Sequence, residues 1–411
     1  MNTNNYIDWI SDEIKYICLT HKKRVAGSVS ERACGDYMAN QLTKWSDTVV
    51  KEDFTLHPNA YAGGWALQSS LGMLSIICFL FSVWFSLVWL TFISVLFTLM
   101  VLVLWVFETA LYRQCTDFLY TKSISQNVMA VRKAENEAKQ RIIICGHADA
   151  AYNMPLMQRF SVATILVMSI SAIAGLFICL IIGVLTVFAN LPQQMIIAFC
   201  IFQVLMVVPR TFFLLFVDWG TVVDGANDNL TGSLIGMSIL KEMAEENHRF
   251  THTDVCCLIT GGEESGLRGA FAYAKANKQE LLDTNSIVIA VDTIHEKDHL
   301  MVYPRGIYHT QKNNEAVCEL LRAAGKECGV TLPDAGFYFG ATDAEAFSRN
   351  KIKAAALCAV RHKPTSYYHT VTDTWDNLDK DCLTITRDIL KTSVELFDKG
   401  INVLNNPNVE V

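Results

Sequence analysis

Apolar and polar residues follow two patterns along the chain, and the first is an alternation of short apolar runs with longer helical stretches. Runs typical of buried strands are RIIICGH (141–147), DVCCLIT (254–260), SIVIAVD (286–292) and AAALCAV (354–360), with further strands expected at 49–56, 125–133 and 300–304. Apolar residues recur at helical spacing in 3–20, 28–46, 231–247, 267–278, 313–328 and 381–400. The alternation predicts an α/β fold: a three-layer sandwich around a mostly parallel mixed sheet.

The second pattern consists of two long stretches without any charged residue. No Asp, Glu, Lys or Arg occurs across the 54 residues from 54 to 107, or across the 50 residues from 160 to 209. A membrane-spanning helix needs about 20 apolar residues. The segment ANLPQQ (189–194) divides the second stretch into two spans. The apolar part of the first, from Leu67 to Phe107, has room for two spans with a tight turn. One long tilted helix is the weaker alternative, because it would place the flanking segments on opposite sides of the membrane.

We therefore expect a water-soluble domain interrupted by two transmembrane hairpins, with four spans in all. The 307 residues outside the uncharged stretches carry all 75 charged side chains, about 24%, which is ordinary for a globular domain. The predicted boundaries assign 1–66, 111–158 and 218–411 to the soluble domain, 67–110 to hairpin one and 159–217 to hairpin two.

Charges near the predicted spans indicate their orientation. Arg113, Lys122, Arg159 and Arg210 flank the domain side, and both hairpin tips lack Lys and Arg. The positive-inside rule then predicts a multi-pass membrane protein whose soluble domain and termini are cytoplasmic, with the lipid bilayer as a partner. The amino-terminal segment lacks the apolar core of a signal peptide.

Composition narrows the function classes. The 13 cysteines include no CxxC pair, which favours buried thiols over disulfides or a sulfur-ligated metal. A net charge of −7 without a basic run gives no support for nucleic-acid binding.

Candidate metal ligands follow the predicted strands. His147 ends IIICGH, Glu263 and Glu264 follow VCCLITGG, and Asp292 ends SIVIAVD. Ligands of open α/β sheets bind beyond the carboxyl ends of the strands, so these side chains are expected to meet. Asp228 in GANDNLTG and His369 in YYHTVTDT complete a set that suits two zinc ions about 3.5–4 Å apart.

Within this set, each residue receives an expected role. Asp228 bridges the two metals, His147 and Asp292 bind one, and Glu264 and His369 bind the other. Glu263 acts as the general base that takes a proton from the metal-bridging water, and Asp149 orients the His147 imidazole.

Each candidate taken alone has a simpler explanation. His147 could be a hydrogen-bonded turn residue, Asp228 a helix cap, the two glutamates an exposed helix start, Asp292 a strand-end residue and His369 a surface histidine. Their joint placement favours the metal site. His295 and His299 lack such support and are expected not to be ligands.

The motifs jointly resemble the co-catalytic dizinc aminopeptidases, the zinc exopeptidases that include bacterial leucyl aminopeptidases and the glutamate carboxypeptidase group. GHADA, GANDNLTG, GGEESGLRGA and YHTVTDT are similar to four motif segments of that family, and RVAGSVSERACGDYMANQL to its amino-terminal helix region. The resemblance covers the soluble domain and neither hairpin, and it implies the roles given above. Asn227 stands where Asp is common, and about 80 residues separate His147 from Asp228 where the family has a short loop.

The resemblance implies a membrane-anchored zinc exopeptidase, most readily an aminopeptidase, which hydrolyses the amino-terminal peptide bond. A glutaminyl cyclase-like acyltransferase and a non-catalytic receptor or scaffold are the alternatives. Because hairpin two inserts between two ligand segments, we expect the site mouth near the bilayer and hydrophobic or membrane-derived peptides as substrates. Tyr368 and Tyr338 are candidate substrate-binding residues.

Overall fold

The computed structural model describes residues 3–306, 310–336, 340–361 and 367–400. The chain forms two compact units. The sheet unit comprises 1–58, 122–153 and 220–411, and the helical unit comprises 59–121 and 154–219.

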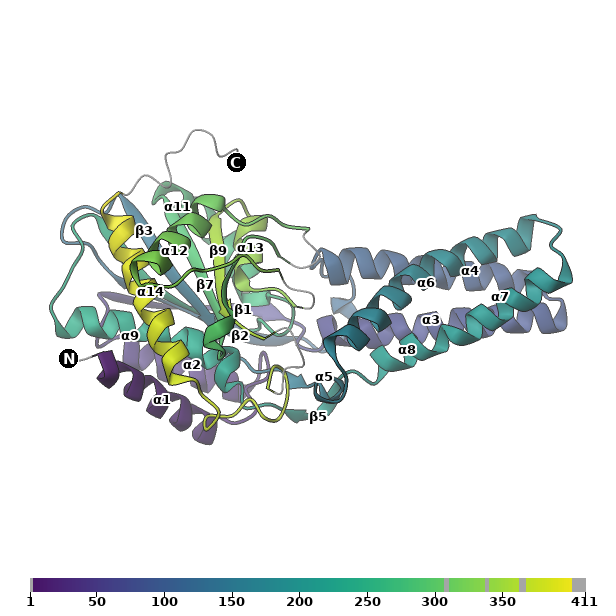
Figure 1. The fold of residues 1–411 in the computed structure, drawn as a ribbon, viewed down its shortest axis with the longest axis horizontal. Coiled ribbons are helices and arrows are strands. Elements are labelled where there is room, and N and C mark those ends of the chain that lie inside the picture. The colour runs from purple at the N-terminus through teal and green to yellow at the C-terminus, as the bar shows by residue number, and fades with distance from the viewer. Residues whose placement is uncertain (1–2, 307–309, 337–339, 362–366, 401–411) are drawn as a thin grey trace. The chain divides into compact units, whose positions relative to one another are not determined.

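The sheet unit is built on a seven-stranded sheet (Figure 1). Its strands, in spatial order, are β1 (Thr48–Leu56), β2 (Ser123–Arg132), β6 (Thr253–Thr260), β3 (Gln140–His147), β7 (Ser286–Ile294), β9 (Lys353–Ala359) and β8 (Leu300–Tyr303). The four central strands β6, β3, β7 and β9 are parallel, and β1, β2 and β8 pair antiparallel. The central strands are buried on both faces, which explains why their sequences are continuously apolar.

Helices cover both faces of this sheet. One face packs against α1 (Thr3–Thr20), α2 (Val29–Leu42), α9 (Thr231–Glu245), α12 (Glu315–Glu327) and α14 (Lys380–Asp398). The other packs against α10 (Arg268–Ala276), α11 (Lys278–Asp283) and α13 (Asp343–Arg349). The short elements are β4 (Tyr152–Asn153), β5 (Asp218–Val222) and single turns at Ala226–Leu230 and Lys297–His299. The predicted α/β fold with a mostly parallel mixed sheet is confirmed.

A close approach between β3 and α9 places the end of β3. A Cβ on Gly146 would lie 2.5 Å from the backbone nitrogen of Ser233, so only glycine fits at this crossing. The Ser233 hydroxyl also donates to the carbonyl of His147 at 2.9 Å. The first turn of α9 therefore fixes the backbone from which the His147 side chain projects.

The helical unit contains four helices long and apolar enough to cross a membrane. They are α3 (Ala60–Phe85), α4 (Val88–Leu104) with a π-helical extension through Ala110, α6 (Val162–Phe188), and α7 (Gln193–Leu205) continued by α8 (Val207–Leu214). The short α5 (Pro155–Arg159) and a turn at Asp117–Leu119 complete the unit. Helix α3 begins before the predicted start of hairpin one at Leu67, because GGWALQSS is weakly apolar yet still helical.

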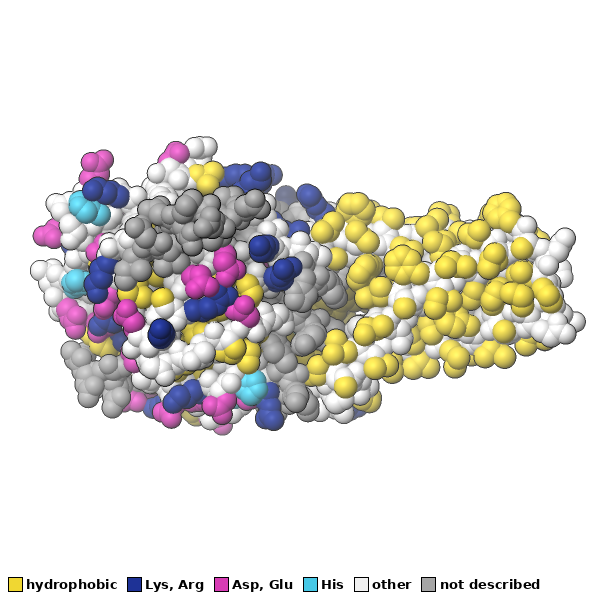
Figure 2. Space-filling view, turned by 45° about the horizontal axis from the view of Figure 1, so that its top comes forward, with side chains coloured by type: hydrophobic (Ala, Val, Ile, Leu, Met, Phe, Trp, Pro, Cys, Tyr) yellow, Lys and Arg dark blue, Asp and Glu magenta, His cyan; other side chains and the backbone are white. Residues whose placement is uncertain are grey.

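Many polar side chains of the helical unit are buried, and many large apolar ones are exposed. On α3, Ser75 and Ser82 are buried, while Ile77, Phe81 and Trp84 are exposed. Figure 2 shows hydrophobic side chains over the visible face of this unit, and charged side chains on the sheet unit. Water would favour the opposite arrangement, so the outer surface suits an apolar solvent.

Candidate metal centre

The five predicted ligands come from five separate segments of the sheet unit. His147 is the last residue of β3, and Asp292 lies near the end of β7. Glu264 lies in the turn after β6, which begins with Gly262 in a left-handed conformation at φ +62°. Asp228 lies in the irregular turn that precedes α9, and His369 in the segment that leads to α14. The structure brings all five together at the carboxyl ends of the parallel strands, as the sequence predicts.

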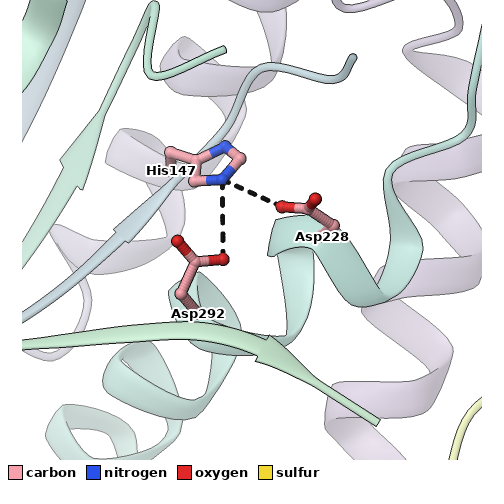
Figure 3. Close-up of side chains that lie close together, drawn as sticks. All are labelled: His147, Asp228 and Asp292. Atoms are coloured by element: carbon pink, nitrogen blue, oxygen red, sulfur yellow. Dashed lines mark hydrogen bonds and ion pairs between the residues drawn. The ribbon is translucent and has the colours of Figure 1, made fainter. Parts of the chain in front are cut away.

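The first half of the cluster joins His147, Asp228 and Asp292 (Figure 3). His147 Nε2 lies 3.1 Å from Asp228 Oδ1 and 3.9 Å from Asp292 Oδ1. All three residues are buried. One imidazole nitrogen and two carboxylate oxygens therefore face a common point.

The second half joins Asp228, Glu264 and His369. His369 Nε2 lies 3.0 Å from Asp228 Oδ2 and 3.3 Å from Glu264 Oε2. Asp228 contributes one carboxylate oxygen to each half, which is the geometry of a bridging ligand. The two half-sites expected from the sequence therefore contain the same residues as these two groups of neighbouring side chains.

The arrangement fits zinc by distance and by donor type. Within each half, the three donor atoms lie within 4.8 Å of one another. Ligands at about 2.0–2.2 Å from a tetrahedral zinc ion are themselves about 3.3 Å apart. Among the described residues, the buried Oε1 of Glu264 has no hydrogen-bond partner. A cation would satisfy this atom, because buried carboxylate oxygens otherwise lose hydration without compensation.

The acid–base balance of the cluster also favours a cation. Burial raises the pKa of Asp292 to about 8 and, with neighbouring carboxylates, raises the pKa values of Glu263 and Glu264. Burial opposes protonation of His369, but Glu264 and Asp228 outweigh it and raise the pKa of this imidazole to about 10. The pKa of His147 is raised for the same reason. Without a metal, the cluster therefore retains protons in place of the missing positive charge.

Asp149 holds the turn that carries the two glutamates. Its Oδ1 accepts the N–H of Glu263 at 3.1 Å, and its Oδ2 accepts the N–H of Glu264 at 3.0 Å. Its Oδ1 also lies 3.4 Å from Nδ1 of His147. One carboxylate thus touches an imidazole and fixes the backbone beneath Glu263, whose Oε2 lies 3.8 Å from His147 Nε2.

Sequence reasoning missed a second carboxylate with a similar task. The buried Asp373 accepts the backbone N–H of Asp228 at 3.2 Å and that of Asn227 at 2.7 Å. Burial and the charge of Asp228 raise the pKa of Asp373 to about 7. The sequence does single out this residue, because Asp373 is the acidic residue of HTVTDT, the segment that carries His369. Asn227 also donates its side-chain amide to Asp373 at 2.9 Å, so an amide at this position relieves carboxylate repulsion.

The remaining candidates from the sequence are the two tyrosines expected to bind substrate and the histidines expected not to bind metal. The ring of Tyr368 stacks on His369, with centroids 4.1 Å apart. Tyr338 lies outside the described residues. His295 packs edge-on against Tyr367, with ring centroids 4.1 Å apart, and is not part of the imidazole–carboxylate groups described above.

Comparisons with known proteins agree with this geometry. Residues 214–394 match the model of peptidase family M28. No curated protein matches the chain. Among solved structures, an aminopeptidase from Aneurinibacillus sp. strain AM-1 has 15% identity and a TM-score of 0.56, covering 95% of this chain and 93% of that one. A glutaminyl cyclase from Fimbriiglobus ruber has 12% identity and a TM-score of 0.56, with 95% of each chain covered.

A zinc-dependent exopeptidase from Parabacteroides distasonis has 12% identity and a TM-score of 0.53, covering 95% of this chain and 96% of that one. At these identities the structural likeness shows the fold, and the family match carries the assignment. Residues 214–394 thus match peptidase family M28, and this match together with the fold supports a zinc metallopeptidase.

Proposed function

We propose that the protein is a membrane-anchored aminopeptidase that uses two zinc ions held by His147, Asp228, Glu264, Asp292 and His369. The observation that carries this proposal is the division of Asp228 between two imidazole–carboxylate groups, each compact enough for one ion. Two ions, when bound, would polarise the scissile carbonyl and lower the pKa of water.

Glu263 is the proposed general base. It is buried beside His147, and it belongs to neither of the two groups that share Asp228. Burial raises the pKa of Glu263, so its carboxylate gains affinity for the proton of the attacking water. The same carboxyl can then deliver that proton to the departing amine. Asp149 keeps the backbone of Glu263 in place during both transfers.

The variant Glu263→Gln tests this role. Loss of the base should lower kcat on amino-terminal peptide bonds by about 10²–10⁴-fold with little change in metal content. Glu280→Gln, on the exposed end of an ion pair with Arg141, is the control and should retain activity. Unchanged cleavage by Glu263→Gln would remove the proposal. Product mass with a Gln-led peptide separates hydrolysis from cyclisation, because only cyclisation loses ammonia without adding water.

We further propose that the four apolar helices anchor the enzyme in a bilayer. Their inward polar contacts include Ser75 Oγ with Thr98 Oγ1 at 2.8 Å and Gln68 with Thr109 at 3.1 Å. Aromatic side chains mark both ends of the helices. Tyr61 and Tyr112 stack at one end, and the exposed Trp84 and Phe188 lie at the other. Such aromatic belts are typical of membrane-water interfaces.

The proposed orientation places the sheet unit and both termini in the cytoplasm. Among the described residues, Cys115 is the exposed cysteine, and it lies in the segment between α4 and β2. A membrane-impermeant maleimide should therefore label Cys115 in inside-out vesicles and leave it unlabelled in intact cells. Labelling in intact cells would contradict the proposed orientation and indicate the opposite one. The proposed substrates are peptides, with hydrophobic or membrane-derived peptides preferred over short polar ones.

A further inference from the structure

The side chain of Arg24 makes contacts that the proposed mechanism does not use. It lies between α1 and α2, in the segment RVAGS, and is 1% exposed. A buried guanidinium is costly unless acceptors surround it. Those acceptors are all backbone carbonyls: Nε donates to Ala148 at 2.9 Å, Nη2 to Asp224 at 2.6 Å and to Gly225 at 3.2 Å, and Nη1 to His21 at 3.3 Å.

Three of these carbonyls, those of Ala148, Asp224 and Gly225, belong to the two segments that carry metal ligands of the first half-site. Ala148 directly follows His147, and Gly225 lies three residues before Asp228. The carbonyl of Arg24 itself accepts the N–H of Ala150 at 2.9 Å. A single residue thus bonds to both segments, which the intervening hairpin separates by about 80 positions in sequence.

The turn before Asp228 is shaped around this contact. Gly225 has φ +60°, and a Cβ at this position would lie 2.8 Å from the Cβ of Ala150, 2.8 Å from the carbonyl oxygen of Asp228 and 3.0 Å from Nη2 of Arg24. The guanidinium therefore lies in the space that a side chain at 225 would need. The Nε2–Oδ1 separation of 3.1 Å between His147 and Asp228 depends on both segments keeping this spacing.

We propose that Arg24 is a positioning residue that sets the affinity of the site for metal by holding the His147 and Asp228 segments at a fixed separation. The inference rests on the proposed function, because it treats both side chains as zinc ligands. Groups that orient ligands typically change metal affinity by about 10–100-fold when removed. The planar guanidinium spans several carbonyls at once, and the single ammonium of lysine cannot do so.

The chain offers a matched control in Arg132. This arginine is also buried, and it donates to the carbonyls of His248 at 3.0 Å, Trp45 at 3.3 Å and Met243 at 3.0 Å. None of these residues belongs to a ligand segment. Arg24→Lys and Arg132→Lys therefore remove comparable backbone clamps, one beside the proposed metal site and one away from it.

The experiment compares both variants as full-length protein in detergent. Zinc affinity is measured by competition with a chromophoric chelator, and thermal unfolding of the metal-free protein reports stability. Both variants should unfold at lower temperature, but only Arg24→Lys should bind zinc about 10–100-fold more weakly. Zinc affinity of Arg24→Lys equal to wild type, or an equal loss in Arg132→Lys, would overturn the inference.

Hydrogen exchange separates failure of this inference from failure of the proposed function. In metal-free protein, Arg24→Lys should speed amide exchange in residues 148–151 and 223–228, and Arg132→Lys should not. If wild type binds no zinc, the proposed function fails, and the exchange result still decides whether Arg24 holds the two segments. Faster exchange in neither segment contradicts the positioning role.

A second pair of variants covers the case in which Arg24→Lys does not fold. Gly225→Ala leaves Arg24 in place but introduces a Cβ into the contact, and it also strains a positive φ. Gly329→Ala imposes the same kind of strain at φ +76°, where nothing lies within 4 Å of the new Cβ. Weaker zinc binding in Gly225→Ala alone shows that the placement of the Asp228 segment sets zinc affinity, as the inference requires, and equal binding in the two variants refutes it.

Discussion

Replacement of Asp149 by Asn tests how much of the site depends on one buried carboxylate. The two oxygens of Asp149 accept the N–H groups of Glu263 and Glu264, at 3.1 and 3.0 Å. An Asn side chain keeps one acceptor and turns an NH₂ group toward the other N–H, so one charge-assisted bond is lost and two donors face each other. The contact of Oδ1 with Nδ1 of His147 is weakened as well.

The lost contacts give the expected size of the change in stability and in zinc affinity. A hydrogen bond to a charged group contributes about 1.5–3 kcal/mol, and a buried donor left without a partner costs about 1–3 kcal/mol. We expect the free energy of unfolding of the metal-free protein to fall by about 2–3 kcal/mol, which corresponds to about 3–5 °C in Tm for a domain of this size. Zinc affinity should fall by about 10–100-fold, because the turn carrying Glu264 is no longer fixed.

Asp254→Asn is the matched control for this measurement. Asp254 is also buried in the sheet unit, accepts the N–H of Ala134 at 3.0 Å, and lies 3.5 Å from Arg141. This variant should lose similar stability and keep wild-type zinc affinity and kcat. Chelator competition and thermal unfolding on both variants give the comparison. Wild-type zinc affinity in Asp149→Asn would refute the reasoning.

Three further predictions follow from other parts of the molecule. Gly146→Ala places a Cβ 2.5 Å from a backbone nitrogen of α9, so the variant's free energy of unfolding should fall by about 3 kcal/mol or more. A Tm within about 2 °C of wild type contradicts the close approach of β3 and α9. Ile178→Lys puts a charge on the exposed face of α6 at a cost of about 2.5–3.5 kcal/mol, and should reduce the membrane-inserted fraction measured by carbonate extraction. Leu282→Lys on the exposed surface of α11 should have no such effect, and equal insertion of both variants counts against a bilayer. The pKa values of Asp292 and His369 are raised to about 8 and about 10, so both side chains hold protons near neutral pH, and a bound metal must displace them. Zinc affinity measured by chelator competition should therefore rise about tenfold per pH unit for each proton released between pH 6 and 8. A zinc affinity that does not change with pH is inconsistent with these residues as ligands.

The sequence predicts the sheet and the convergence of the candidate ligands, because both depend on the local pattern of apolar residues and on where polar residues end the apolar runs. The runs that became β3, β6 and β7 are apolar because these strands are buried on both faces. Polar residues that interrupt such runs at their ends, such as His147 and Asp292, lie at the edge where the parallel strands terminate. This rule predicts the positions of His147, Glu264 and Asp292 from the sequence.

Residues that act through backbone contacts were not predictable in the same way. Arg24 and Asp373 bind carbonyls and amides of distant segments, and no periodicity or spacing indicates which backbone groups a side chain will reach. Helix α13 was also missed, because its seven residues are too short to show a period and follow a glycine-rich segment. Such contacts depend on tertiary packing, which a single sequence does not display.

The bounds of the apolar helices show a related limit. The segment GGWALQSS at the start of α3 contains Gly63, Gly64 and Gln68, which lower its hydropathy although these residues are buried within the helical unit. Small and polar residues suit close helix packing in a bilayer, so a hydropathy pattern underestimates the length of helices with an inward polar face.

Metal content of the purified protein tests the central claim most directly. After zinc loading and removal of free metal, atomic emission should give about two zinc ions per wild-type chain, and fewer in Asp228→Asn, in which the shared carboxylate is lost. Fewer than about one zinc per chain in folded wild-type protein would contradict the account.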